Sequence, residues 1–159
     1  MTYLALKWLH LVGAALLFGT GLGIAFFAWF GYRRGMQEAD IGLIRGVLRL
    51  TVIADTVFTA SAAIVQPVTG YFLWRMTGGQ WPDAWLAWVL VLYVFVGACW
   101  LPVVAIQVQL RNAAIAAQTV GQLDARFHRR FIVWFALGIP AFLGVMGLFV
   151  LMITRGYFR

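Results

Sequence analysis

Four long apolar segments constrain the fold of this chain more than any other feature of its sequence. They run approximately over residues 3–31, 50–74, 84–110 and 131–154. Each is longer than the roughly 20 residues that an α-helix needs to cross the hydrocarbon core of a bilayer. Only short polar stretches join them, so consecutive helices are expected to run in opposite directions. The sequence therefore predicts an all-α polytopic membrane protein, built as a four-transmembrane-helix up-down bundle.

The composition supports this class of protein. The chain has 159 residues, of which 64% are hydrophobic and 11% are charged, whereas about 25% of the residues in soluble domains are charged. Eight tryptophans and 13 phenylalanines fit aromatic belts at the two membrane interfaces. Because no linker or shift in composition divides the chain, residues 1–159 are predicted to form a single four-helix transmembrane domain.

The net charge of +7 is distributed unevenly. Of the 12 Lys and Arg residues, eight lie in the first and third connections: Arg33, Arg34, Arg45, Arg49, Arg111, Arg126, Arg129 and Arg130. The other four lie on the opposite side: Lys7, Arg75, Arg155 and Arg159. Basic residues accumulate on the cytoplasmic side of membrane proteins and attract anionic lipids there. We therefore expect a multi-pass protein of the bacterial inner (plasma) membrane, with both termini periplasmic, anionic lipids at the cytoplasmic face and no nucleic acid as partner.

Two helices are expected to extend beyond the apolar segments on the arginine-rich side. Residues 40–49 alternate apolar and basic faces at helical spacing, which indicates an early start to the second helix. Residues 111–118 are rich in alanine, which indicates a late end to the third. Gly121 is expected to break that helix, and Asp124 to cap the start of the fourth.

Polar and small residues recur at helical spacing along three of the segments. The faces are Thr51, Asp55, Thr59, Ala62, Gln66 and Gly70; Tyr93, Gly97, Trp100, Val104, Gln107 and Arg111; and His10, Gly13, Leu17, Thr20 and Gly21. They are expected to meet in the centre of the bundle. With a rise of about 1.5 Å per residue, His10, Gln66, Tyr93 and Met146 lie roughly 10–14 Å inside the outer boundary. A second cluster, of Asp55, Gln107, Trp134 and Arg130, is expected near the inner boundary.

His10 is the candidate ligand for a metal. Neutral imidazole binds haem iron in many proteins, and the glycines beside it would let a flat macrocycle approach the backbone. In this hypothesis Gln66 and Tyr93 bind a haem propionate or a quinone, and Met146 is the candidate for the opposite ligand. The alternative is that His10 bonds to Gln66 or Tyr93 and simply holds helices together. His128 lies among arginines on the other side and cannot share one haem with His10.

Asp55 is the only carboxylate within an apolar segment. A charge at that depth costs about 2.5–3.5 kcal/mol on insertion scales. Two interpretations follow: a buried ion pair with Arg111 or Arg130, which would offset the cost, or a proton relay.

Several short motifs carry a resemblance to known families. They are Trp8-Leu9-His10, Phe18-Gly19-Thr20-Gly21, Gln66-Pro67-Val68-Thr69-Gly70, Trp100-Leu101-Pro102 and Gly138-Ile139-Pro140-Ala141-Phe142. With these motifs nearly the whole chain resembles a bacterial family of predicted integral membrane proteins, domain of unknown function 2269. More distantly it resembles the copper-resistance-D-like superfamily, which includes oxygen-independent membrane protoporphyrinogen oxidases.

The distant resemblance implies a haem, but this chain departs from the pattern of those oxidases at one position. Those oxidases are four-helix haem proteins with a histidine early in helix one, which His10 matches, and a threonine-glycine late in helix two, which Thr69 and Gly70 match. They also carry a lysine after a tryptophan early in helix three. Here Trp85 is followed by Leu-Ala-Trp-Val. The resemblance thus implies haem at His10 and speaks against protoporphyrinogen oxidation.

Two functions from different classes follow. The first is a b-haem redox protein with its site near the outer face, exchanging electrons with a quinone. The second is a non-catalytic accessory subunit of a larger membrane complex, with a protein partner or a second copy of the chain packed against it. Whether the protein is an enzyme is left open by the sequence.

Overall fold

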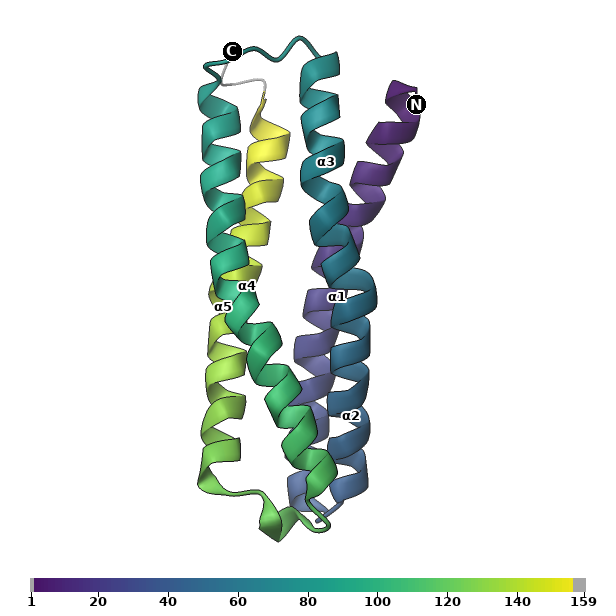
Figure 1. The fold of residues 1–159 in the computed structure, drawn as a ribbon, viewed down its shortest axis with the longest axis vertical. Coiled ribbons are helices and arrows are strands. Elements are labelled where there is room, and N and C mark those ends of the chain that lie inside the picture. Colours follow the sequence, from purple (N-terminus) through teal and green to yellow (C-terminus); the bar gives the residue numbers. More distant parts are fainter. Residues whose placement is uncertain (1, 156–159) are drawn as a thin grey trace.

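The structure, a computed structural model, describes residues 2–155 and is almost entirely helical within them (Figure 1). The elements in order are α1 (Tyr3–Gln37), α2 (Ile41–Ala54), the π-helix η1 (Asp55–Ala60), α3 (Ser61–Met76), α4 (Ala84–Ala116), the short 3₁₀-helix η2 (Val120–Gln122) and α5 (Ala125–Ile153). Because α2, η1 and α3 follow one another without a break, the described chain has four helices long and apolar enough to cross a membrane. This confirms the predicted all-α four-helix membrane fold.

The helices extend beyond the predicted apolar segments on the arginine-rich side. α1 continues to Gln37 rather than ending at residue 31, and α5 begins at Ala125, before the apolar segment that starts at residue 131 and directly after the cap expected at Asp124. The extensions before α2 and after residue 110 of α4 are confirmed. Aspartate side chains cap three of the helices. Asp40 accepts from the Leu43 amide at 3.0 Å, Asp83 from Leu86 at 3.1 Å, and Asp124 from Phe127 at 2.8 Å.

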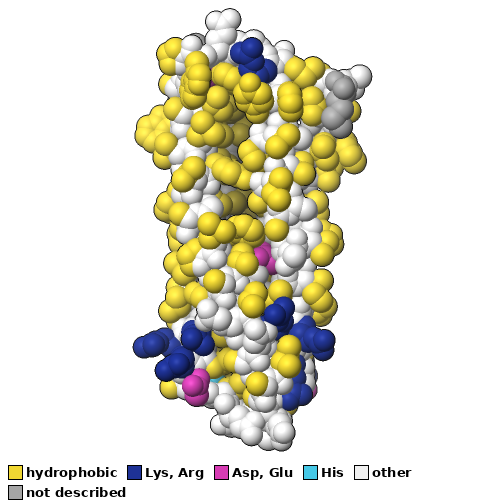
Figure 2. All heavy atoms as spheres, in the orientation of Figure 1, with side chains coloured by type: hydrophobic (Ala, Val, Ile, Leu, Met, Phe, Trp, Pro, Cys, Tyr) yellow, Lys and Arg dark blue, Asp and Glu magenta, His cyan; other side chains and the backbone are white. Residues whose placement is uncertain are grey.

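The two ends of the bundle differ in charge. The connections 38–40 and 117–124 form what we call the arginine-rich end, and the connection 77–83 lies at the other, terminal end, where the described chain also starts and stops (Figure 1). Most of the Lys and Arg side chains visible in Figure 2 gather near the arginine-rich end, below a long hydrophobic surface. Apolar helix surface facing outward over this length places the protein in a lipid bilayer.

All four membrane helices contribute to a core in the half of the bundle near the arginine-rich end. The cluster is Ala28, Ile44, Leu48, Val103, Leu110, Ala114, Ala117, Val120, Leu123, Phe127, Phe131 and Trp134. Arg45 reaches across from α2, and its Nε donates to the Ala114 carbonyl at 3.0 Å while its guanidinium also bonds the Ala117 carbonyl. These bonds satisfy carbonyls that the end of α4 leaves without helical partners.

The half near the terminal end is packed differently, as two helix pairs. Here α1 packs on α3, and α4 packs on α5, while α3 makes few contacts with α4. Glycines allow the close approach within a pair: a Cβ at Gly144 would lie 2.5 Å from the Val96 side chain. Figure 2 shows the surface hollowed between the two pairs in this half. The candidate site lies on the α1–α3 pair.

Candidate functional site

His10 lies half-buried between α1 and α3, and its hydrogen bonds determine which ring nitrogen carries the proton. Its Nδ1 is 2.8 Å from the Thr69 hydroxyl oxygen. The Thr69 hydroxyl already donates its hydrogen to the Val65 carbonyl at 2.8 Å. With the Thr69 hydrogen on the Val65 carbonyl, Nδ1 donates to the Thr69 oxygen and the lone pair of the ring lies on Nε2. Nε2 has no hydrogen-bond partner among residues 2–155.

Two glycines make room for the groups around His10. A Cβ at position 70 would lie 3.3 Å from His10 Cε1, and a Cβ at position 13 would lie 2.4 Å from Gln66 Nε2. The space at Gly13 lets Gln66 Nε2 donate to the His10 carbonyl at 2.7 Å. One imidazole is thus oriented by a threonine and a glycine of the neighbouring helix. This is how proteins hold a metal-binding histidine, with the second nitrogen fixed by an acceptor.

Of the other residues predicted for this site, only Gln66 lies beside His10. The Tyr93 hydroxyl crosses from α4 and donates to the Ala63 carbonyl of α3. Ala63 lies almost one turn deeper than Gln66, or about 4.5 Å at the usual helical rise. Met146 is on α5, in the other helix pair, and is 38% exposed. The Tyr93 hydrogen is therefore used within the bundle, whereas Gln66 keeps one N–H and its carbonyl oxygen for another partner.

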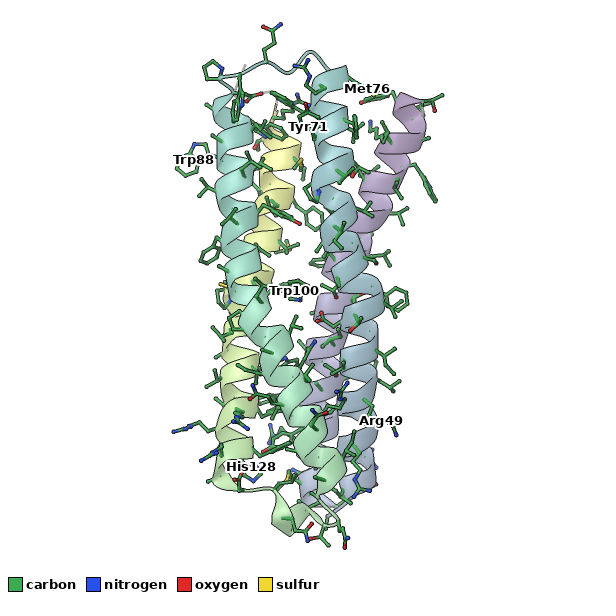
Figure 3. The ribbon with its side chains drawn as sticks, viewed as in Figure 1. Arg49, Tyr71, Met76, Trp88, Trp100 and His128 are labelled. Atoms are coloured by element: carbon green, nitrogen blue, oxygen red, sulfur yellow. The ribbon has the colours of Figure 1, made fainter. Side chains whose placement is uncertain are left out.

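His128 lies at the arginine-rich end (Figure 3), and both of its ring nitrogens are hydrogen-bonded. Its Nδ1 is 2.6 Å from the Tyr32 hydroxyl, and its Nε2 is 3.1 Å from the Leu123 carbonyl. Since a carbonyl can only accept, Nε2 donates and Tyr32 donates to Nδ1. This histidine ties α1 to the start of α5 and offers no free nitrogen lone pair.

A second polar cluster surrounds Asp55, at the start of the π-helix. The Asp55 side chain is buried, with 5% exposed. Its Oδ2 accepts from Gln107 Nε2 at 2.6 Å, and its Oδ1 accepts from Trp100 Nε1 at 3.2 Å. Gln107 in turn accepts from Trp134 Nε1 at 3.4 Å. Three membrane helices are joined by this network, and three of the four residues predicted for the inner cluster take part in it.

The ion pair proposed for Asp55 is not what the structure shows. Within residues 2–155 neither Arg111 nor Arg130 forms an ion pair with it, and Arg111 donates to the neighbouring Asn112 instead. Arg130 lines a cavity of about 380 Å³ at the arginine-rich end. Long arginine side chains near a helix end extend toward the interface, where hydration is cheaper than burial beside a carboxylate. Hydrogen bonds to a charged group contribute about 1.5–3 kcal/mol each, so the two N–H donors offset much of the insertion cost.

The sequence indicated His10 and Asp55 but missed the residues that position them. Thr69 was indicated only by the family resemblance, because it lies one residue away from the polar face that ends in Gly70. The π-helix and the role of Gly13 were also missed, since neither has a signature in local composition. The one available signal was that Gly13 and Gln66 lie at similar depths, and small residues let neighbouring membrane helices approach closely.

Comparison with known proteins gives one match. The model of the family described as "Predicted integral membrane protein (DUF2269)" matches residues 4–156. No curated protein and no solved structure matches the chain. The matched residues include all four membrane helices and both polar clusters.

Proposed function

We propose that this chain, which belongs to the family of predicted integral membrane proteins whose model it matches, binds a b-type haem at His10 and transfers electrons in the membrane. One observation carries the proposal: His10 Nδ1 lies 2.8 Å from the Thr69 hydroxyl, and Nε2 has no hydrogen-bond partner within residues 2–155. Imidazole nitrogens in this state bind iron.

The residues around His10 fit such a group in three respects. The ring is half-buried on a helix pair that borders a hollowed surface (Figure 2). Gly70 leaves no side chain against the ring edge, and Gln66 has hydrogen-bonding capacity to spare. When bound, haem supplies one-electron transfer, and a quinone is the membrane-soluble partner we propose. Met146, on the other helix pair, is the second residue that we propose would hold the group.

An absorption spectrum of the protein purified in detergent from haem-replete cells tests the proposal. We expect a Soret band that shifts on reduction and responds to carbon monoxide, because only one strong ligand is available. His10→Ala should remove most of the haem, and His128→Ala, whose ring nitrogens are both engaged, should not. A colourless wild-type preparation would falsify the proposal.

A second candidate is an accessory subunit of a larger membrane complex. The observation in its favour is the sparse contact between α3 and α4. A partner helix or a second copy seated along that hollow would complete the packing. This candidate predicts a colourless protein that co-purifies with a partner, and His10→Ala would then weaken the α1–α3 contact without any spectral change.

We also propose the orientation and location that the charges indicate. The arginine-rich end would face the cytoplasm of a bacterial cell and contact anionic headgroups of the inner membrane. His10 would then lie toward the periplasmic face.

A further inference from the structure

The π-helix holds two buried polar side chains that the haem proposal does not use. Asp55 and Thr59 are both buried, with 5% and 8% exposed, while Val57 and Phe58 between them are 53% and 45% exposed. Asp55 and Thr59 therefore lie on the same, inward side of one helical turn. π-turns inside α-helices often occur at functional sites.

Asp55 has hydrogen-bond donors but no ionic partner in the described chain. Each carboxylate oxygen accepts one N–H, from Trp100 and Gln107 respectively (Figure 3 shows Trp100 pointing inward from α4). Both donors are neutral, so the negative charge is not cancelled. Each oxygen can still accept a further bond, and a net charge within the apolar part of a bundle is generally balanced.

Thr59 supplies the second observation. Its hydroxyl oxygen is buried and has no hydrogen-bond partner within residues 2–155. The other hydroxyl of this segment, on Thr56, donates to the Val52 carbonyl of its own helix at 2.8 Å. Buried hydroxyls are nearly always bonded, so an unpartnered one on the same side of the π-helix as a buried carboxylate points to a small polar ligand.

From this geometry we infer that Asp55 and Thr59 together bind a monovalent cation, either a proton or a sodium ion, that neutralises the carboxylate within the membrane. A proton would convert the carboxylate to a carboxylic acid whose O–H needs an acceptor, and the Thr59 hydroxyl is an unpartnered group on the same side of the helix. A sodium ion would take the carboxylate and hydroxyl oxygens as ligands, since hard cations prefer oxygen. The site is separate from His10 and does not depend on the haem.

Few other groups near Asp55 can titrate or carry charge. α1 has no titratable residue between His10 and Tyr32, and α5 has none from residue 131 to residue 153. α4 contributes Cys99, Tyr93, whose hydroxyl donates to the Ala63 carbonyl, and Arg111, one turn beyond Gln107. Arg49 of α2 and Arg130 of α5 lie toward the arginine-rich end. A pH-dependent signal from a buried carboxylic acid can therefore be assigned to Asp55 with one substitution.

Two measurements on the full chain in detergent distinguish the two cations. The first is the infrared carbonyl band of a protonated carboxylic acid, which should disappear in Asp55→Asn. The second is thermal unfolding in sodium chloride against choline chloride at equal ionic strength. A carbonyl band that is present at neutral pH in the wild type and absent in Asp55→Asn identifies the bound cation as a proton. A melting temperature that rises with sodium alone, without the band, identifies sodium.

Thr59→Val tests the site even if Asp55→Asn fails to fold. It should weaken the apparent affinity for the bound cation by roughly tenfold or more, the loss expected for one bond to a charged group. Thr56→Val is the matched control and should behave as wild type. The proposal is overturned by a protein that shows neither the band nor the sodium response, or by a Thr59→Val protein that matches wild type in both.

Discussion

At the scale of single residues, the two histidines of the chain are distinguished by what their nitrogens contact. His10 donates from Nδ1 to Thr69 and keeps Nε2 free, whereas both nitrogens of His128 are engaged with Tyr32 and Leu123. The difference rests on one hydroxyl whose own hydrogen is used by the Val65 carbonyl. A threonine on a neighbouring helix can thus determine whether a histidine can bind a metal.

Removing that hydroxyl should weaken haem binding without removing the ligand. Thr69→Val keeps the shape of the side chain but leaves His10 Nδ1 without an acceptor, so the ring loses its orientation. We expect haem affinity to fall by about 10–100-fold, the usual effect of losing such a supporting contact. Haem titration followed at the Soret band measures it. Thr69→Ser should restore binding, and equal affinities for the serine and valine variants would count against a positioning role.

At the scale of elements, glycines decide which helices can approach each other. At Gly13 a Cβ would lie 2.4 Å from Gln66 Nε2, whereas at Gly19, on the same helix, it would meet nothing within 4 Å. Glycine has a low helix propensity at both positions. Only at Gly13 does a neighbouring side chain occupy the space that a Cβ would need.

Gly13→Ala and Gly19→Ala form a matched pair on α1. Gly13→Ala should push the Gln66 amide off the His10 carbonyl, losing a hydrogen bond of about 1 kcal/mol. Gly19→Ala should be neutral or stabilising by up to about 1 kcal/mol, through helix propensity alone. Thermal unfolding in detergent compares them. If Gly13→Ala were the more stable of the two, the α1–α3 contact would not depend on that close approach.

The connection between α3 and α4 is held by an aspartate. Trp74 Nε1 donates to Asp83 Oδ2 at 2.7 Å, and the other oxygen caps α4. The Trp74 hydrogen bond is the main reason that the pKa of Asp83 lies below its usual range. A carboxyl with a lowered pKa in the folded state contributes stability above its unfolded pKa. That contribution is lost as the pH falls through the folded value.

Acid should therefore loosen this connection below about pH 4, the ordinary aspartate range. We expect Trp74→Phe to reduce the loss of melting temperature between pH 5 and pH 3 (roughly the range in which aspartates titrate). Asp83→Asn should reduce it as well while preserving the helix cap, because asparagine also caps helices. The effect is expected to be small, since the carboxyl is only partly buried. An acid response unchanged in both variants would assign it to other carboxyls.

At the scale of the whole molecule, charge separates the two ends of the bundle. The arginines of the helix ends that adjoin the connections 38–40 and 117–124 lie at one end, and few basic groups lie at the other (Figure 2). This asymmetry predicts how the protein is inserted. Arg159, one of the four basic residues counted on the minority side, lies outside the described residues.

A reporter fused after Arg159 tests the orientation. We expect a periplasmic reporter to be active there, and a cytoplasmic reporter to be active when inserted in the 117–124 connection. The reverse pattern would place His10 near the cytoplasmic face and contradict the predicted periplasmic location of the site.

The sequence by itself determined the number of membrane helices and the residues that begin them. Apolar length and capping aspartates are local properties. A long apolar segment in a bilayer forms a helix because its backbone N–H and C=O groups must bond to each other. The tertiary structure decided which polar groups meet. Asp55 contacts Gln107 and Trp100 rather than Arg111 or Arg130, and His10 contacts Thr69, because these choices depend on helix rotation, on close approach at Gly13 and on the π-turn at Asp55. Rotation and approach arise from packing between helices, and spacing within one helix does not encode them.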